Sequence, residues 1–163
     1  MKNVFSVSKR FLLICSVVTM GALVLSGCKK DNNNNDNKTN YSISGNASGS
    51  QMVPAVSDTG TATISGTYNG NTRVLTYTTN WSNLSGAPTS GGFYSGATGV
   101  NGTLVGSSWD LGTGLTGTGT FSGQTTLTAD QANQLLNGGW YYSFGTAANP
   151  TGEVRGQITA SPM

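Results

Sequence analysis

The chain has 163 residues, a length typical of one domain with appendages, and it contains no histidine. The lack of histidine excludes serine and cysteine catalytic sites that need an imidazole base, and it excludes metal sites built on imidazole. From residue 41 onward only two arginines face four carboxylates, too few cations to bind nucleic acid through its phosphates.

Residues 1–27 have the pattern of a bacterial secretion signal. Three basic residues precede an apolar run at residues 11–25, which is shorter than the roughly 20 residues of a transmembrane helix. The sequence Leu-Ser-Gly-Cys that follows resembles the lipobox of bacterial lipoproteins, in which the chain is cut before the cysteine and the cysteine is acylated. The resemblance assigns signal recognition to Leu25, Ser26 and Gly27, and lipidation to Cys28.

Residues 28–40 are predicted to be the lipidated cysteine and a flexible polar linker, because residues 29–40 contain no apolar side chain. Cys15 is removed with the signal peptide, so the mature chain cannot form an internal disulfide. Lys29 replaces the aspartate that, in lipoproteins of Gram-negative bacteria, signals retention at the inner membrane. The resemblance therefore favours a lipid anchor in the outer membrane, with the domain facing the periplasm or the cell surface.

Residues 41–163 are predicted to form one all-β domain. Short segments rich in β-branched and aromatic residues alternate with glycine-rich turns, and the pair Asn69-Gly70 predicts a tight hairpin turn. The predicted strands lie at residues 41–45, 61–68, 73–79, 100–105, 117–127, 139–145 and 152–160. Seven or eight strands without intervening helices indicate an antiparallel β-sandwich.

One short helix is expected after Thr128. The Thr128 side chain can cap the first turn and Gln131 can complete a capping box, while Gly138 ends the helix. Ala132, Leu135 and Leu136 share one face, so this helix should pack on the sandwich between two strands.

The spacing Gly-x-Gly-x-x-Gly at residues 112–117 matches a dinucleotide-binding fingerprint only by chance. That site needs a helix after the glycines to bind the phosphates, whereas the residues that follow here have a strand pattern. We therefore expect no nucleotide, no metal and no other cofactor.

Asp110 and Glu153 are the candidate pair for carboxylate-dependent hydrolysis of a glycan. The simpler interpretation is that Asp110 opens a turn, while Glu153 and Arg155 lie on one face of a strand and form a surface ion pair. No histidine or lysine follows residue 40 to serve as a partner base, so the hydrolase remains the second hypothesis.

The aromatic residues suggest a recognition surface. Trp140, Tyr142 and Phe144 alternate with Tyr141 along one strand, so the first three are predicted to be in the core. If exposed, Trp81, Trp109 and Tyr141 would form a candidate binding surface for a sugar ring or a protein partner.

Three segments of the domain resemble the CHRD domain, a family named from chordin. They are residues 48–56 (SGSQMVPAV), 126–131 (TLTADQ) and 146–158 (TAANPTGEVRGQI). In the last, Asn149-Pro150-Thr151-Gly152 suits a β-turn before a final strand. The resemblance implies an immunoglobulin-like β-sandwich and no established molecular activity.

The chain departs from the family pattern where other members carry histidine. Phe93-Tyr94-Ser95-Gly96 and Gly145 occupy those places, and Met52 replaces a usual glutamate. Any metal chemistry of other members should therefore be absent here. The sequence as a whole predicts a lipid-anchored envelope protein that is not an enzyme but a binding or structural module for a protein or glycan. The alternative is a weak hydrolase of envelope or extracellular glycans.

Overall fold

The computed structural model describes residues 39–163. The predicted signal peptide, its recognition residues and the lipidation site at Cys28 lie outside this range. Among the described residues, no helix is both long enough and apolar enough to span a membrane.

Within residues 39–163, nine strands form one antiparallel sheet in the order β5-β4-β7-β8-β1-β2-β3-β6, with β9 also paired to β1. The elements, in chain order, are β1 (Asn40–Ser48), the 3-10 turn η1 (Gly49–Gln51), β2 (Thr61–Asn69), β3 (Val74–Ser82), β4 (Pro88–Ser95), β5 (Thr103–Val105), β6 (Gly119–Thr126), α1 (Ala129–Leu136), β7 (Trp140–Thr146), β8 (Val154–Gln157) and β9 (Thr159–Pro162).

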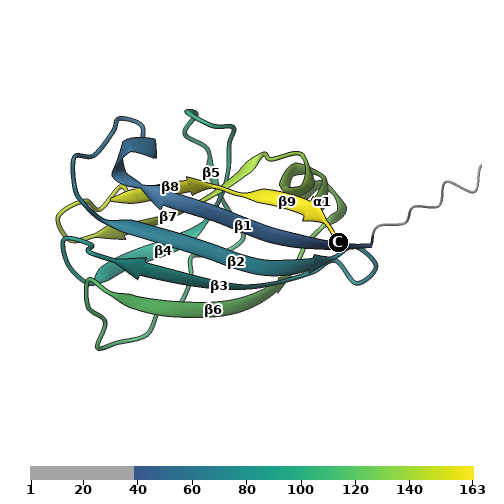
Figure 1. Cartoon of the computed structure of the whole chain (residues 1–163), viewed down its shortest axis with the longest axis horizontal. Coiled ribbons are helices and arrows are strands. Elements are labelled where there is room, and N and C mark those ends of the chain that lie inside the picture. The colour runs from purple at the N-terminus through teal and green to yellow at the C-terminus, as the bar shows by residue number, and fades with distance from the viewer. Residues whose placement is uncertain (1–38) are drawn as a thin grey trace, which may run out of the picture. The chain divides into compact units, whose positions relative to one another are not determined.

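The sheet curls so that β4 and β7 lie behind β1, β2 and β3 (Figure 1). The layers are joined where β1 meets β8 through the single pair Ser48 and Arg155. Across the core, the ring centroids of Tyr77 on β3 and Phe93 on β4 lie 4.7 Å apart. The predicted immunoglobulin-like antiparallel β-sandwich with one short helix is confirmed.

The alternation of side chains along β3 explains how this core forms. Leu75, Tyr77, Thr79 and Trp81 are buried, while their neighbours face outward or lie half-buried. The same period predicted Trp140, Tyr142 and Phe144 as core residues, and all three have no exposed surface. Burial of each such side chain contributes about 1.5–3 kcal/mol.

Strand β4 is missing from the prediction because Pro-Thr-Ser-Gly-Gly-Phe-Tyr-Ser has little β-propensity. The strand forms because it pairs with β7 on one side and β5 on the other. A Cβ atom on Gly91 would lie 2.8 Å from Trp109, and one on Gly92 would lie 2.8 Å from Leu104. A larger residue at Gly91 would displace the packed Trp109 ring, whereas at Gly92 only the flexible end of the Leu104 side chain would have to shift.

Two local predictions are wrong. The turn between β2 and β3 is not a two-residue Asn-Gly turn: residues 70–73 form it, with Arg73 at a positive φ of 58°. The side chain of Asn69 directs this longer turn by accepting hydrogen bonds from the N–H groups of Asn71 and Thr72. The predicted strand 152–160 divides into β8 and β9, because the chain leaves β7 and pairs with β1 instead.

The helix agrees with the prediction. Thr128 accepts a hydrogen bond from the Gln131 N–H, and the Gln131 side chain accepts one from the Thr128 N–H, which completes the capping box. Gly138 follows the helix with a positive φ of 69°. Ala132 and Leu135 are buried, and Leu136 packs against the core.

Replacing Thr128 with alanine should lower the free energy of unfolding by about 1 kcal/mol, because the Gln131 N–H loses its acceptor. Urea unfolding followed by circular dichroism measures the change. Thr72→Ala, at an exposed turn position, is the control and should have little effect. Equal losses in the two variants would contradict a capping role.

Candidate functional site

Trp81 and Trp109 do not form an exposed recognition surface. Trp81 is only 2% exposed, because its position on β3 faces the core, and its indole N–H donates to the Thr116 carbonyl at 3.0 Å. Trp109 is half-buried among aromatic rings, with its centroid 5.1 Å from that of Phe93. Trp81 therefore does not meet the condition of exposure on which its candidate binding role depended, and most of Trp109 serves packing.

Tyr141 faces away from the core, as the alternation predicted, but it is only 6% exposed. Other side chains cover its two sides. The ring of Tyr94 stacks on it with 5.2 Å between centroids and 11° between planes, and the Cζ atom of Arg155 lies 3.6 Å from its centroid. Tyr141 therefore does not meet the condition of exposure, because Tyr94, Tyr141 and Arg155 form a packed stack on the outer side of β4, β7 and β8.

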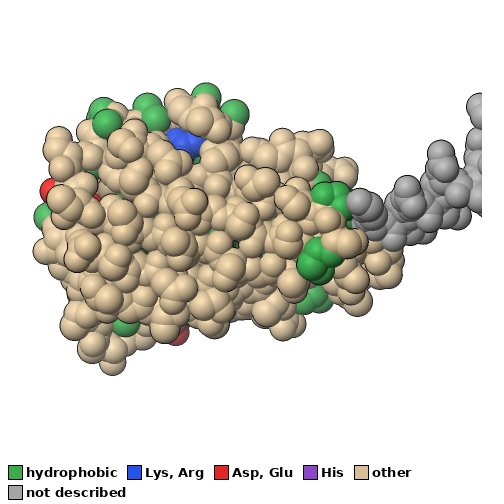
Figure 2. Space-filling model, viewed as in Figure 1, with side chains coloured by type: hydrophobic (Ala, Val, Ile, Leu, Met, Phe, Trp, Pro, Cys, Tyr) green, Lys and Arg blue, Asp and Glu red, His purple; other side chains and the backbone are tan. Residues whose placement is uncertain are grey.

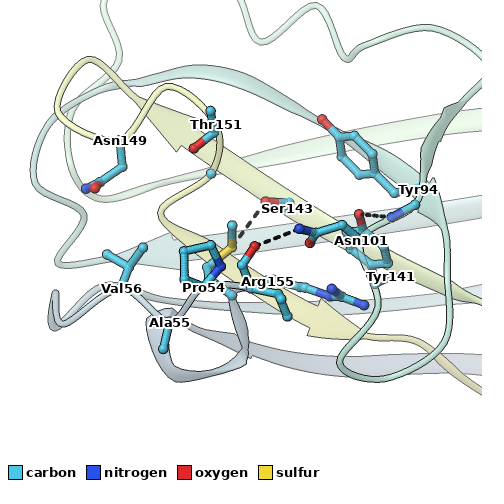
Figure 3. A pocket seen from close by; sticks show the side chains of 14 residues that line it. Pro54, Ala55, Val56, Tyr94, Asn101, Tyr141, Ser143, Asn149, Thr151 and Arg155 are labelled. Carbon is cyan, nitrogen blue, oxygen red and sulfur yellow. Dashed lines mark hydrogen bonds between the residues drawn. The ribbon is translucent and has the colours of Figure 1, made fainter.

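This stack borders a pocket of about 260 Å³. Figure 3 shows Tyr94, Tyr141 and Asn101 on one side of it and the segment 54–56 on the other. The complete lining is Met52, Val53, Pro54, Ala55, Val56, Tyr94, Asn101, Gly102, Tyr141, Ser143, Asn149, Thr151, Gly152 and Arg155.

Hydrogen bonds hold the loops that form the walls of the pocket. The Asn101 side chain donates to the Val53 carbonyl at 2.7 Å, and the Gly102 N–H donates to the Tyr141 hydroxyl at 3.1 Å (Figure 3). The segment that follows η1 is thus tied to the loop between β4 and β5. The pocket is preformed by contacts between residues far apart in the sequence.

Among residues 39–163, Arg155 is the only charged residue that lines the pocket. It is 2% exposed, and burial lowers the pKa of its guanidinium, an effect that the neighbouring Tyr141 opposes. Arginine is so basic that the group nevertheless remains a cation. Its Nη2 donates to the Ala97 carbonyl at 2.8 Å, whereas Nη1 has no hydrogen-bond partner among residues 39–163.

The family model of the CHRD domain matches residues 43–158. The chain belongs to the CHRD domain family. No curated protein and no solved structure matches the chain. Membership of this family favours a binding or structural module, and the match includes every residue that lines the pocket of this CHRD domain.

The positions at which the sequence departs from the family pattern have structural roles in this CHRD domain. Phe93 belongs to the core and contacts Tyr77, Trp109 and Trp140. A Cβ atom on Gly145 would lie 2.6 Å from the Ser90 hydroxyl, so a larger residue needs a rearrangement here. Within residues 39–163, no group of three or more histidine, cysteine, aspartate or glutamate side chains is placed to hold a metal ion.

In this CHRD domain, Glu153 and Arg155 do not form the surface ion pair that the sequence predicted. β8 begins at Val154, so the alternation that would place the two side chains on one face does not extend to Glu153. Glu153 is fully buried, and its carboxylate accepts hydrogen bonds from the Ser85 N–H, the Ser85 hydroxyl and the Thr146 hydroxyl at 2.7, 2.5 and 2.6 Å.

Burial raises the pKa of Glu153, but hydrogen bonds from Ser85, Thr146 and Asn149 outweigh it, so the pKa lies below its ordinary value. The carboxylate fixes the loop after β3 against β7. Asp110 is exposed and accepts a bond from the Gly112 N–H at 3.3 Å, as expected of a turn residue. A hydrolytic pair must present both carboxylates to the sugar, and this CHRD domain encloses one of them.

The predicted strand after the glycine motif at residues 112–117 is confirmed. The motif lies in a loop, with Gly112 and Gly114 at positive φ, and β6 follows it instead of a helix. This part of the CHRD domain therefore lacks the helix N-terminus that binds a nucleotide pyrophosphate.

The sequence prediction named Tyr141 as a binding residue but gave no such role to Tyr94, Asn101 or Arg155, which also line the pocket. Arg155 carried one available signal, since it is one of only two cations after residue 40. The loops that form the walls of the pocket carried no such signal, because the hydrogen bond from Asn101 to Val53 joins residues 48 positions apart.

Proposed function

We propose that the chain is a lipid-anchored binding module of the bacterial cell envelope, and that the pocket beside Arg155 is its ligand site. The lipobox-like segment and the polar linker support the anchor, and the CHRD family supports a binding role. The partner would be a protein or a glycan of the envelope. The anchor would hold the module at the outer membrane, facing the periplasm or the cell surface.

The observation that carries the binding role is the pocket with its unpartnered cationic donor. A concave site that combines apolar residues, here 52–56, with polar side chains such as Asn101 and Arg155 is typical of small-ligand binding. The surrounding face is largely uncharged, with isolated acidic and basic groups (Figure 2). Recognition would therefore depend on this site and not on a broad charged surface.

The hydrolase alternative has no specific support, because Glu153 is enclosed and its carboxylate is occupied by hydroxyl and amide donors. The Asp110 side chain accepts from the Gly112 N–H, as a turn residue does. Within residues 39–163, no exposed residue is hydrogen-bonded to it as a catalytic partner.

Replacing Cys28 with serine should abolish acylation, because the thiol is the group that receives the lipid. Cells that express each variant are grown with radiolabelled palmitate, and the protein is isolated and counted in separated membrane fractions. Cys15→Ser is the matched control: it removes the other cysteine, lies in the predicted signal peptide and should leave the label in place. Label that persists in Cys28→Ser would contradict the anchor.

The binding role is tested separately from the anchor. The Cys28→Ser protein should bind isolated envelope fractions saturably, because binding would depend on the domain and not on the lipid. Sedimentation with increasing protein concentration measures this. A bound amount that rises linearly, without saturation, would contradict a specific site.

A further inference from the structure

Arg155 is a buried cation that no acidic group among residues 39–163 neutralises. The guanidinium donates to the Ala97 carbonyl and stacks on Tyr141, but Nη1 has no partner within the described part of the chain. Taking a charge out of water costs free energy unless an opposite charge and complete hydrogen bonding compensate for it. An anionic ligand would supply both.

The nearby carboxylates are engaged elsewhere. Asp58 accepts from the Asn149 side chain at 2.6 Å, and Glu153 accepts from Ser85 and Thr146. In the part of the chain that the structure describes, no other charged residue than Arg155 lines the pocket. A ligand with one negative charge therefore matches the pocket better than a dianion such as phosphate, which favours several cationic donors.

Polar side chains of the pocket are also engaged with the protein. The Asn101 amide donates to Val53, and the Ser143 hydroxyl donates to the Val154 carbonyl at 2.9 Å. A sugar needs free partners for its hydroxyl groups, and these residues offer few. The walls at residues 52–56 consist of Met52, Val53, Pro54, Ala55 and Val56, all of them apolar. These features favour a ligand with an apolar group beside its charge.

A second hollow, of about 230 Å³, lies on another side of Arg155 and is also bordered by Gln157. The two residues are two positions apart on β8, and therefore on the same face. The Gln157 side chain donates to the Gly96 and Gly138 carbonyls, whereas its Oε1 is buried and has no partner among residues 39–163. Arg155 and Gln157 thus border one hollow, and each carries a buried polar atom without a partner among residues 39–163, a donor on Arg155 and an acceptor on Gln157.

We infer that Arg155 and Gln157 bind the free carboxyl end of a peptide whose last residue is apolar. The carboxylate accepts from Nη1 of Arg155, the N–H of the last residue donates to Oε1 of Gln157, and the apolar side chain lies against residues 52–56. A carboxylate on an apolar body without an N–H would use only the first of these contacts. The inference rests on the proposed function and specifies its ligand.

Binding requires a small local movement. Nη1 is buried, so a ligand oxygen reaches it only when neighbouring side chains move. Met52 and Val53 line both hollows and therefore lie between them. The flexible thioether of Met52 can change rotamer at little cost.

The experiment uses the full-length protein in detergent and isothermal titration calorimetry. N-acetyl-L-valine should bind at least about tenfold more tightly than its uncharged amide, since only the acid pairs with the buried cation. Isovalerate, which has the carboxylate and apolar group but no N–H, should bind between the two. Equal affinity for acid and amide would overturn the inference, and so would tighter binding of glucuronate, which would indicate a glycan ligand.

Two arginine variants test the residue itself. Arg155→Met should weaken binding of N-acetyl-L-valine at least about tenfold, whereas Arg73→Met, at the exposed turn between β2 and β3, should leave it unchanged. Equal effects of the two variants would overturn the assignment. If Arg155→Met does not fold, the guanidinium NMR signals of the wild-type protein serve instead: they should shift with the acid and not with the amide, and no shift with the acid would overturn it.

The two proposals fail in different ways. Saturable binding to envelope fractions without binding of N-acetyl-L-valine would overturn the carboxylate inference and leave the binding module intact. Failure of the envelope experiment, with N-acetyl-L-valine still bound through Arg155, would overturn only the envelope partner.

Discussion

Replacing Glu153 with alanine is expected to lower the free energy of unfolding by about 3 kcal/mol or more. The carboxylate accepts from the Ser85 N–H, the Ser85 hydroxyl and the Thr146 hydroxyl, and alanine leaves these donors without that acceptor. Each unsatisfied buried polar group costs about 1–3 kcal/mol. Urea unfolding at neutral pH measures the loss.

The pH dependence of stability identifies the carboxylate as the cause. The pKa of Glu153 is lower in the folded chain than in the unfolded chain, so its stabilisation is complete above its ordinary pKa of 4.5 and is lost as the pH falls through the folded value. Glu153→Gln cannot ionise, so its stability should change less on acidification.

Asp110→Asn is the control for Glu153, because Asp110 is exposed in a turn. This variant should keep nearly the stability of the wild-type protein. A loss at Asp110 as large as that at Glu153, or an unchanged acid response in Glu153→Gln, would contradict the role given to the buried network.

Replacing Trp81 with alanine should cost about 3–5 kcal/mol, because the change leaves a large cavity in the core. The indole packs 5.2 Å from the ring of Phe144 and donates to the Thr116 carbonyl. Thermal and urea unfolding measure the loss.

The matched control is Trp109→Ala, which should cost less because Trp109 is only half-buried. A Trp81→Ala protein that unfolds like the wild type but loses ligand binding would show that the residue acts in recognition instead of packing.

Local patterns in the sequence predicted most of the fold. Thr128 and Gln131 contain the whole capping box within four residues, and the alternation from Trp140 to Phe144 separates the core face from the outer face. Strand β4 could not be found in this way, because its glycines and serines are strand-forming only between β5 and β7.

The site depends on contacts that no local pattern contains. The alternation along the strand correctly predicted that Tyr141 faces away from the core. Its burial, however, results from contacts with Tyr94 and Arg155, which lie on two other strands. The same alternation predicted that Glu153 and Arg155 lie on one face of a strand. Glu153 precedes the start of β8, however, and a residue outside the strand need not follow its alternation. Tertiary packing therefore decided which polar residues are enclosed.

The two ends of the described chain lie together at one end of the sandwich. The Met163 N–H donates to the Asn40 carbonyl at the start of β1, whereas Arg155 pairs with Ser48 at the other end of that strand. Figure 1 shows the C-terminus beside the start of β1. A biosensor surface or fluorescent fusion attached after Met163 would therefore leave the entrance beside Arg155 free of steric hindrance.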